Sequence, residues 1–191
     1  MTTVVGLFKE IKDANQAVEA LRQHGLGGTE VSVLARKEVL DSLGLDSKEK
    51  DNEVAMGTVA GAASGATFGT FAGLFLGLSA IALPGVGPVL SVGALATILG
   101  STVLGAGVGA AAGGLLLGAL VKMGVPEDQA HLYSEGVRRG GILVAVQTDQ
   151  EHTPQVAQSL REANAIDIDT LEEALQAEGG NYFGERERAV S

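Results

Sequence analysis

One feature constrains this chain more than any other. Residues 54–121 form an uninterrupted block of 68 positions without Asp, Glu, Lys, Arg, His, Asn or Gln, and the block holds 16 of the 28 glycines. An apolar stretch of this length must be buried in protein or in lipid, because exposing it to water is costly. All the charged residues lie outside it. The sequence therefore predicts a polar protein, residues 1–53 and 122–170, interrupted by an apolar insert, with an acidic, charged tail at 171–191.

Glycine occurs at every fourth position in the first part of the insert. Residues i and i+4 share one face of a helix, so six such glycines would leave a groove of bare backbone. Relative to alanine they would cost roughly 5–6 kcal/mol of helix stability, which the close approach of another helix can offset. The predicted packing face consists of Gly57, Gly61, Gly65, Gly69, Gly73 and Gly77.

A break divides the insert into two arms, and it consists of Pro84, Gly85, Val86, Gly87 and Pro88. No straight helix crosses two prolines and two glycines so close together. The predicted helical arms are Val54–Leu83 and Val89–Val121, each about 45–50 Å long against about 30 Å for the hydrocarbon core of a bilayer. The second arm repeats glycine at sevens and at fours, and these residues complete the predicted helix-packing and oligomerisation set: Gly93, Gly100, Gly107 and Gly114, with Gly105, Gly109 and Gly113.

The flanking segments alternate between strand and helix patterns. Residues 3–8 and 30–35 are β-type runs separated by a helix pattern, and a second series gives a helix after Pro126, a strand at 142–146, a helix from Thr153 and a short strand at 166–168. Without the first helix of the second series the order is β-α-β-β-α-β. The predicted fold is α+β: a ferredoxin-like (split βαβ) domain interrupted by a long glycine-zipper α-helical hairpin.

Charge and composition narrow the chemistry. The net charge of −10 argues against nucleic acid, and the adjacent basic pairs, Arg36-Lys37 and Arg138-Arg139, are too small for a polybasic patch. There is no Cys, and His24, His131 and His152 lack metal-ligand spacing to other ligating residues. There is no phosphate-binding P-loop lysine and no nucleophile elbow. We therefore expect no enzyme activity, no cofactor and no metal.

Short segments in both flanks resemble a known family. With residues 4–8, 17–21 and 30–35, the sequence resembles the N-terminal domain of bacterial heat-induced or general stress proteins. Residues 124–127, Tyr133 and 140–144 resemble the second half of the members with a glycine-rich hydrophobic insert. The resemblance implies a bacterial, stress-associated and membrane-linked protein, and it provides no catalytic residues.

The leading functional hypothesis is a non-enzymatic stress protein that self-assembles through its hairpin in the membrane, with itself and membrane lipid as partners. Lys48, Lys50 and Lys122 near the ends of the insert favour an α/β domain on the cytoplasmic side of the bacterial inner membrane. One alternative is a water-soluble, cytoplasmic homo-oligomer whose hairpins form a shared apolar interior that holds lipid. A pore or channel is another. No sequence feature identifies a small-molecule ligand.

Overall fold

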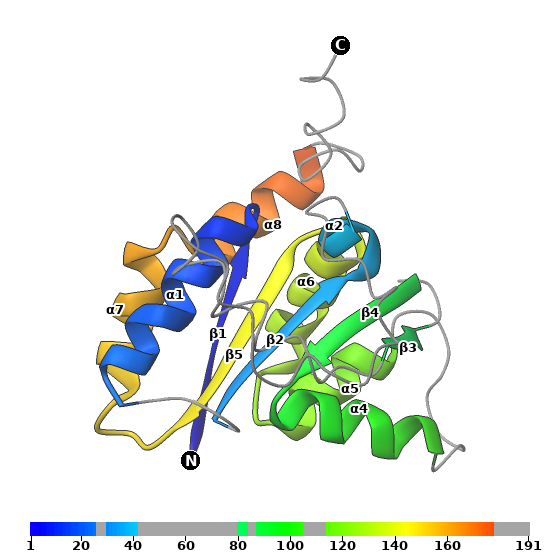
Figure 1. Cartoon of the computed structure of the whole chain (residues 1–191). Coiled ribbons are helices and arrows are strands. Elements are labelled where there is room, and N and C mark those ends of the chain that lie inside the picture. Colours follow the sequence, from blue (N-terminus) through cyan, green and yellow to red (C-terminus); the bar gives the residue numbers. More distant parts are fainter. Residues whose placement is uncertain (26–29, 42–79, 84–86, 105–113, 178–191) are drawn as a thin grey trace, which may run out of the picture.

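The computed structural model describes residues 1–25, 30–41, 80–83, 87–104 and 114–177. In these ranges helices pack on both faces of one β-sheet (Figure 1). The strands are β1 (Thr2–Phe8), β2 (Val31–Arg36), β3 (Ala80–Leu83), β4 (Gly87–Val92) and β5 (Ile142–Thr148). The helices are α1 (Ile11–Gln23), α2 (Lys37–Asp41), α4 (Ala94–Leu104), α5 (Gly114–Lys122), α6 (Glu127–Arg138), α7 (Thr153–Glu162) and α8 (Ile168–Ala177).

The sheet has five strands in the order β1-β5-β2-β4-β3, and every pairing is antiparallel. β5 lies between β1 and β2, so the two halves of the chain that flank the insert form one continuous sheet (Figure 1). β1 and β2 run in the same direction because both pair antiparallel with β5. The predicted α+β class is confirmed.

Two hydrophobic cores lie on the two faces of the sheet. The first packs α1 and α7 against residues such as Phe8 and Val144, and the second packs α4, α5, α6 and α8 against residues such as Leu7 and Leu143. Leu143 and Val144 are neighbours in β5, and both are fully buried on opposite faces. This is why β5 reads as an unbroken apolar run, since a strand covered on both faces needs no polar alternation.

The insert differs from its prediction in the described residues. Residues 80–83 and 87–92 form two paired strands rather than the end and the beginning of helical arms, with Leu83 opposite Gly87 and Ala82 opposite Pro88. β4 in turn pairs with β2, with Val33 opposite Val92. Gly87 and Pro88 of the predicted break are therefore the first residues of β4. A helix satisfies its own backbone hydrogen bonds, whereas a strand needs a neighbouring strand. The edge of β2 supplies that neighbour for β4.

The second arm is also not one continuous helix. After β4 it continues as α4, with 11 residues, and later as α5, with nine. Within the described part of the chain no helix is both long enough and apolar enough to cross a membrane. The prediction of transmembrane helices is therefore wrong for α4 and α5, while residues 54–79 lie outside the described residues.

The predicted strand at 166–168 is reduced to a single bridge. Ile166 pairs with Leu7 of β1, and the helix α8 begins only two residues later at Ile168. Asp167 Oδ1 accepts a hydrogen bond of 3.2 Å from the backbone N–H of Asp169 in the first turn of this helix. An Asp that binds its own backbone two residues on favours a turn, which ends the strand pairing.

Candidate functional site

The predicted glycine faces are only partly within the described residues. Gly93 has φ +83° at the junction of β4 and α4, Gly100 lies in α4 and Gly114 is the first residue of α5. Gly93 is therefore not part of a helical stripe, which corrects the seven-residue repeat. Gly87 and Pro88 lie in β4. The following predicted residues lie outside the described ranges: Gly57, Gly61, Gly65, Gly69, Gly73, Gly77, Pro84, Gly85, Gly105, Gly107, Gly109 and Gly113.

Gly93 holds the β4–α4 junction in place. A Cβ at this position would overlap the backbone of Val31 and Ser32 in the neighbouring strand β2. Ser32 Oγ accepts a hydrogen bond of 3.2 Å from the backbone N–H of Leu95, which caps the first turn of α4. The close approach of two backbones explains this glycine, so its role is to join a strand to a helix rather than to seat a partner helix.

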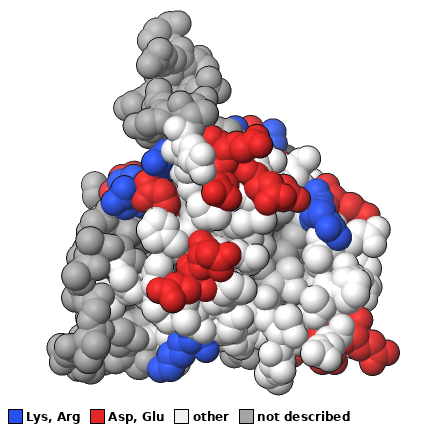
Figure 2. Space-filling view, turned by 180° about the vertical axis from the view of Figure 1, so that it is seen from behind, with Lys and Arg blue, Asp and Glu red and all other residues white. Residues whose placement is uncertain are grey.

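Acidic side chains gather on the face formed by α6 and α8 (Figure 2). Two lie in the first turn of α6, where the helix dipole favours negative charge. Others lie in or just before α8, which packs against α6 through the buried Leu171. We call this set the acidic face, and it consists of the exposed residues Glu127, Asp128, Asp167, Asp169, Glu172 and Glu173. Such a field attracts a basic partner and repels an acidic one.

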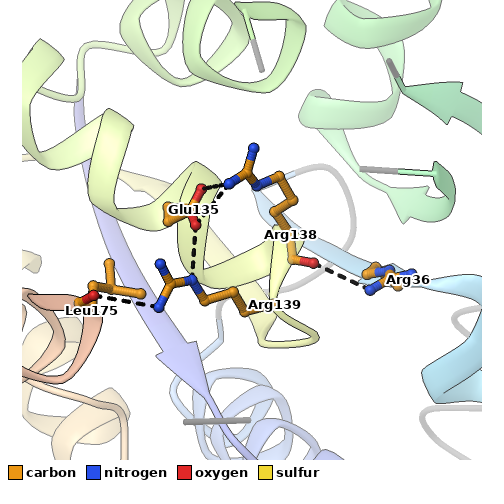
Figure 3. Close-up of polar contacts among 5 residues, drawn as sticks. All are labelled: Arg36, Glu135, Arg138, Arg139 and Leu175. Atoms are coloured by element: carbon orange, nitrogen blue, oxygen red, sulfur yellow. Dashed lines mark hydrogen bonds and ion pairs between the residues drawn. The ribbon is translucent and has the colours of Figure 1, made fainter. Parts of the chain in front are cut away.

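An arginine corner lies where β2 meets the ends of α6 and α8 (Figure 3). Arg36 Nη1 donates to the carbonyl oxygen of Arg138 at 3.1 Å, at the last residue of α6. Arg139 Nη1 donates at 3.4 Å to the carbonyl oxygen of Leu175 near the end of α8. Both arginines thus satisfy carbonyl groups in the last turn of a helix, where a positive charge also complements the dipole.

Glu135 connects two of these arginines. Its carboxylate accepts from Arg138 Nη2 at 2.9 Å and from Arg139 Nε at 2.8 Å. Burial opposes ionisation of Glu135, but the hydrogen bonds from Arg139 and Arg138 outweigh it, so its pKa lies below its ordinary value. The side chains of Glu135 and Arg139 are 18% and 19% exposed, whereas Arg138 is 50% exposed and has guanidinium surface left for a partner.

Sequence reasoning missed this corner. It treated Arg36-Lys37 and Arg138-Arg139 as separate pairs, but the fold brings them together over a sequence separation of 102 residues. The available signal was positional, because each pair follows the last buried residue of a strand or helix. Only the packing of α6 beside β2, with the carboxyl-terminal ends of both elements together, decides that the two pairs meet.

Three further titratable side chains, Tyr133, His24 and His152, have hydrogen-bond partners within the fold. Burial raises the pKa of Tyr133 to about 12, with a further contribution from the Asp167 carboxylate, and the phenol O–H donates to the carbonyl of Val5 at 3.2 Å. His24 Nδ1 lies 2.9 Å from Gln155 Nε2. His152 Nδ1 lies 2.7 Å from Asp149 Oδ1 in the turn before α7. No three His, Cys, Asp or Glu residues in the described ranges lie close enough together to hold a metal ion.

Comparison with known proteins identifies the family. A family model described as the ActD subunit of alternative complex III matches residues 2–170. No curated protein and no solved structure matches the chain. The match extends from β1 to the first turn of α8, so it includes both halves of the sheet, the insert, the arginines and Glu135 of the arginine corner, and the acidic-face residues up to Asp169.

This finding corrects four predictions. The resemblance to stress proteins is wrong, because strand and helix motifs as short as 4–8 and 17–21 recur in unrelated α+β proteins. A stress function, with self-assembly in a membrane, in a soluble oligomer or as a pore, is likewise overturned. The partners that the family indicates are other subunits of the complex, in place of copies of this chain and lipid. The chain belongs to the ActD subunit family of alternative complex III.

Proposed function

We propose that the chain is a non-catalytic assembly subunit of alternative complex III, a membrane-associated respiratory electron-transfer complex. The observation that carries the proposal is the family match over residues 2–170. The fold agrees with such a role, because the half-buried polar groups of the arginine corner are used to join α6, α8 and β2. A subunit of this kind contributes contact surface rather than reacting groups.

Two described surfaces suit contacts with other subunits. The acidic face would meet basic side chains, and the exposed half of Arg138 would meet a carboxylate. We further propose that the glycine faces of the insert pack closely against helices of neighbouring subunits. Their spacing of four residues in the sequence supports this, because a bare helical face permits close approach of another backbone.

We propose a ferredoxin-like ancestry for the sheet. The spatial order Ile166, β1, β5, β2, with α1 and α7 on one face, is that of a split βαβ unit whose fourth strand is a single residue. β4 and β3 extend it at the β2 edge. On this view residues 1–53 and 122–170 are the two halves of one domain. Residues 54–121 are its insert and 171–191 its acidic tail, whose first residues belong to α8.

We also propose that the domain lies on the cytoplasmic side of the bacterial inner membrane as part of the complex. Lys48 and Lys50 before the insert and Lys122 after it support this orientation, because lysine is enriched on the cytoplasmic side of membrane-associated segments.

The test is purification of the complex through an affinity tag on another of its subunits. This chain should be recovered in constant proportion to the other subunits, and its deletion should lower the amount of assembled complex. The electron-transfer rate per remaining complex should stay unchanged. Recovery of the chain apart from all other subunits would overturn the proposal, and loss of electron transfer in a fully assembled complex would overturn its non-catalytic part.

A further inference from the structure

The outer edge of β1 is a row of backbone groups that point away from the sheet. Leu7 accepts a hydrogen bond of 2.8 Å from the N–H of Ile166, and Val5 accepts one from the Tyr133 hydroxyl. Both carbonyls therefore face away from β5. In an antiparallel pair the N–H and C=O of one residue point to the same side and the side alternates along the strand, so Thr3 faces outward as well.

Hydrogen bonding in the neighbouring strand β5 agrees that the backbone groups of Thr3 and Val5 point outward. Gln147 is the β5 residue opposite Thr3, and its N–H donates at 2.9 Å to Glu30, beside β2. Its backbone groups therefore point away from β1. Thr3 and Gln147 form a pair without mutual hydrogen bonds, as Val5 and Ala145 do, which leaves the N–H groups of Thr3 and Val5 on the outer edge.

Among the described residues, backbone pairing covers only the Leu7 end of this edge. If the antiparallel pairing that begins at Ile166 continued, Ile168 would lie opposite Val5, but α8 begins at Ile168 and leads the chain away. Within the described residues no hydrogen bond reaches the N–H of Thr3, the C=O of Thr3 or the N–H of Val5. Exposure changes at the same point, because residues 2–5 are half-buried and residues 6–8 are buried.

The surroundings of the open edge indicate what fits there. Val5, Leu132 and Ile168 are half-buried apolar side chains packed on the core beneath α6 and α8. Asp167 and Asp169 of the acidic face are exposed at the point where the chain turns away from β1. An extended segment with an apolar side chain towards Val5 and basic side chains beside it would satisfy the backbone, the apolar rim and the charge together.

We propose that the edge of β1 at Thr3 and Val5 receives an extended, basic segment of another subunit of alternative complex III by β-strand addition. This rests on the proposed function. The incoming strand takes the place that the chain's own fourth strand leaves after Ile166. Its backbone supplies the hydrogen bonds, and its basic residues give the contact its orientation.

Amide hydrogen exchange tests the proposal directly. Exchange is measured on the full chain alone and within the purified complex, then read residue by residue by mass spectrometry after rapid quenching. The amides of Thr3 and Val5 should exchange rapidly in the free chain and about tenfold or more slowly in the complex. Val4 is the internal control, because its amide faces β5 and is protected in both states. Equal exchange of Thr3 and Val5 in the two states would overturn the proposal.

A pair of variants tests the same edge through assembly. Val5→Pro removes the outward N–H without removing a hydrogen bond to β5, and Val5→Ala controls for loss of the side chain. Val5→Pro should lower recovery with the tagged complex at least tenfold, while Val5→Ala is recovered like the wild type. Equal recovery of all three chains contradicts the proposal. If Val5→Pro does not fold, the exchange measurement on the wild type decides.

The outcomes also separate this proposal from the proposed function. If the wild-type chain is absent from the tagged complex, the proposed function fails. If it is present and Thr3 and Val5 remain unprotected, only the β1 contact fails. Protection of both amides in the isolated chain that increases with its concentration would assign the edge to a second copy, and would overturn the proposal as well.

Discussion

At the scale of single residues, two glycines that both lie within helices differ in what surrounds them. Gly136 is buried in α6, and a Cβ built on it would overlap Cδ2 of Leu7 in β1. Gly118 is exposed in α5, and a Cβ built on it would contact nothing. Glycine weakens a helix by about 1 kcal/mol relative to alanine. The close packing between helix and sheet therefore suits a glycine at Gly136, whereas no contact among the described residues calls for one at Gly118.

We predict that Gly136→Ala lowers the free energy of unfolding by about 1–3 kcal/mol, because overpacking against Leu7 exceeds the gain in helix propensity. The matched variant Gly118→Ala should raise it by up to about 1 kcal/mol. Urea unfolding followed by circular dichroism measures both. A neutral or stabilising Gly136→Ala would contradict the prediction and show that the Leu7 side chain moves aside at little cost.

The His152–Asp149 contact makes stability depend on pH in a defined way. Hydrogen bonding to Asp149 raises the pKa of His152 above 6.5, so its contribution is present below 6.5 and is lost as pH rises through the folded-state pKa. The backbone and side-chain hydrogen bonds of His152 lower the pKa of Asp149 below 3.8, so that contribution is lost as pH falls through the folded-state value. We predict that His152→Gln lowers the melting temperature more at about pH 5 than at about pH 8. A difference that does not change with pH would contradict the contact.

At the scale of elements, the arginine corner decides how α6 and α8 end. Arg36 and Arg139 each bind a carbonyl in the last turn of one of these helices, and Glu135 binds both Arg138 and Arg139. Three elements that are distant in the sequence thus share one polar cluster at their ends. The sequence shows two ordinary basic pairs and one glutamate, and only the packing gives them a common role.

Replacement of Glu135 tests how much the arginine corner contributes to stability. Glu135→Gln removes the charge between two arginines and should cost about 1–3 kcal/mol of unfolding free energy at neutral pH. The low pKa of Glu135 means that the wild-type advantage is present above 4.5 and disappears as pH falls through the folded-state pKa. Glu172→Gln is the control, since Glu172 is exposed and accepts a hydrogen bond from Gln176 of its own helix. Equal effects of the two variants would argue against a structural role for the corner.

At the scale of the whole molecule, the sheet joins the two halves of the chain. β5 comes from the second half and lies between β1 and β2 from the first. A fragment of residues 1–53 therefore has no partner strand between its own two strands. We predict that fragments 1–53 and 80–191 bind each other when co-expressed and that 1–53 alone does not fold. Affinity capture of one fragment through the other, with circular dichroism of each alone, measures this. Independent folding of residues 1–53 would contradict the shared sheet.

Most elements outside the insert were predictable from the sequence alone, and the strand at 166–168 is the exception. The runs at 3–8, 30–35 and 142–146 are strands, and the patterns after Pro126 and from Thr153 are helices. Their signals are local, because hydrophobic periodicity and helix-start residues act within a few positions. The family was not predictable in this way, because the same local patterns occur in many unrelated chains.

The sequence by itself determined that residues 54–121 differ from the rest, that the flanks are α+β and that the basic residues are few. Tertiary structure alone decided that residues 80–83 and 87–92 are strands, that two arginine pairs meet, and that Ile166 is the last described residue that pairs with the outer edge of β1. The physical reason is the same in each case. Strand pairing depends on which distant segment of backbone lies next to the strand. The hydrogen bond from Arg36 to the end of α6, across 102 residues, depends on the packing of distant elements in the same way. No local sequence pattern contains that information.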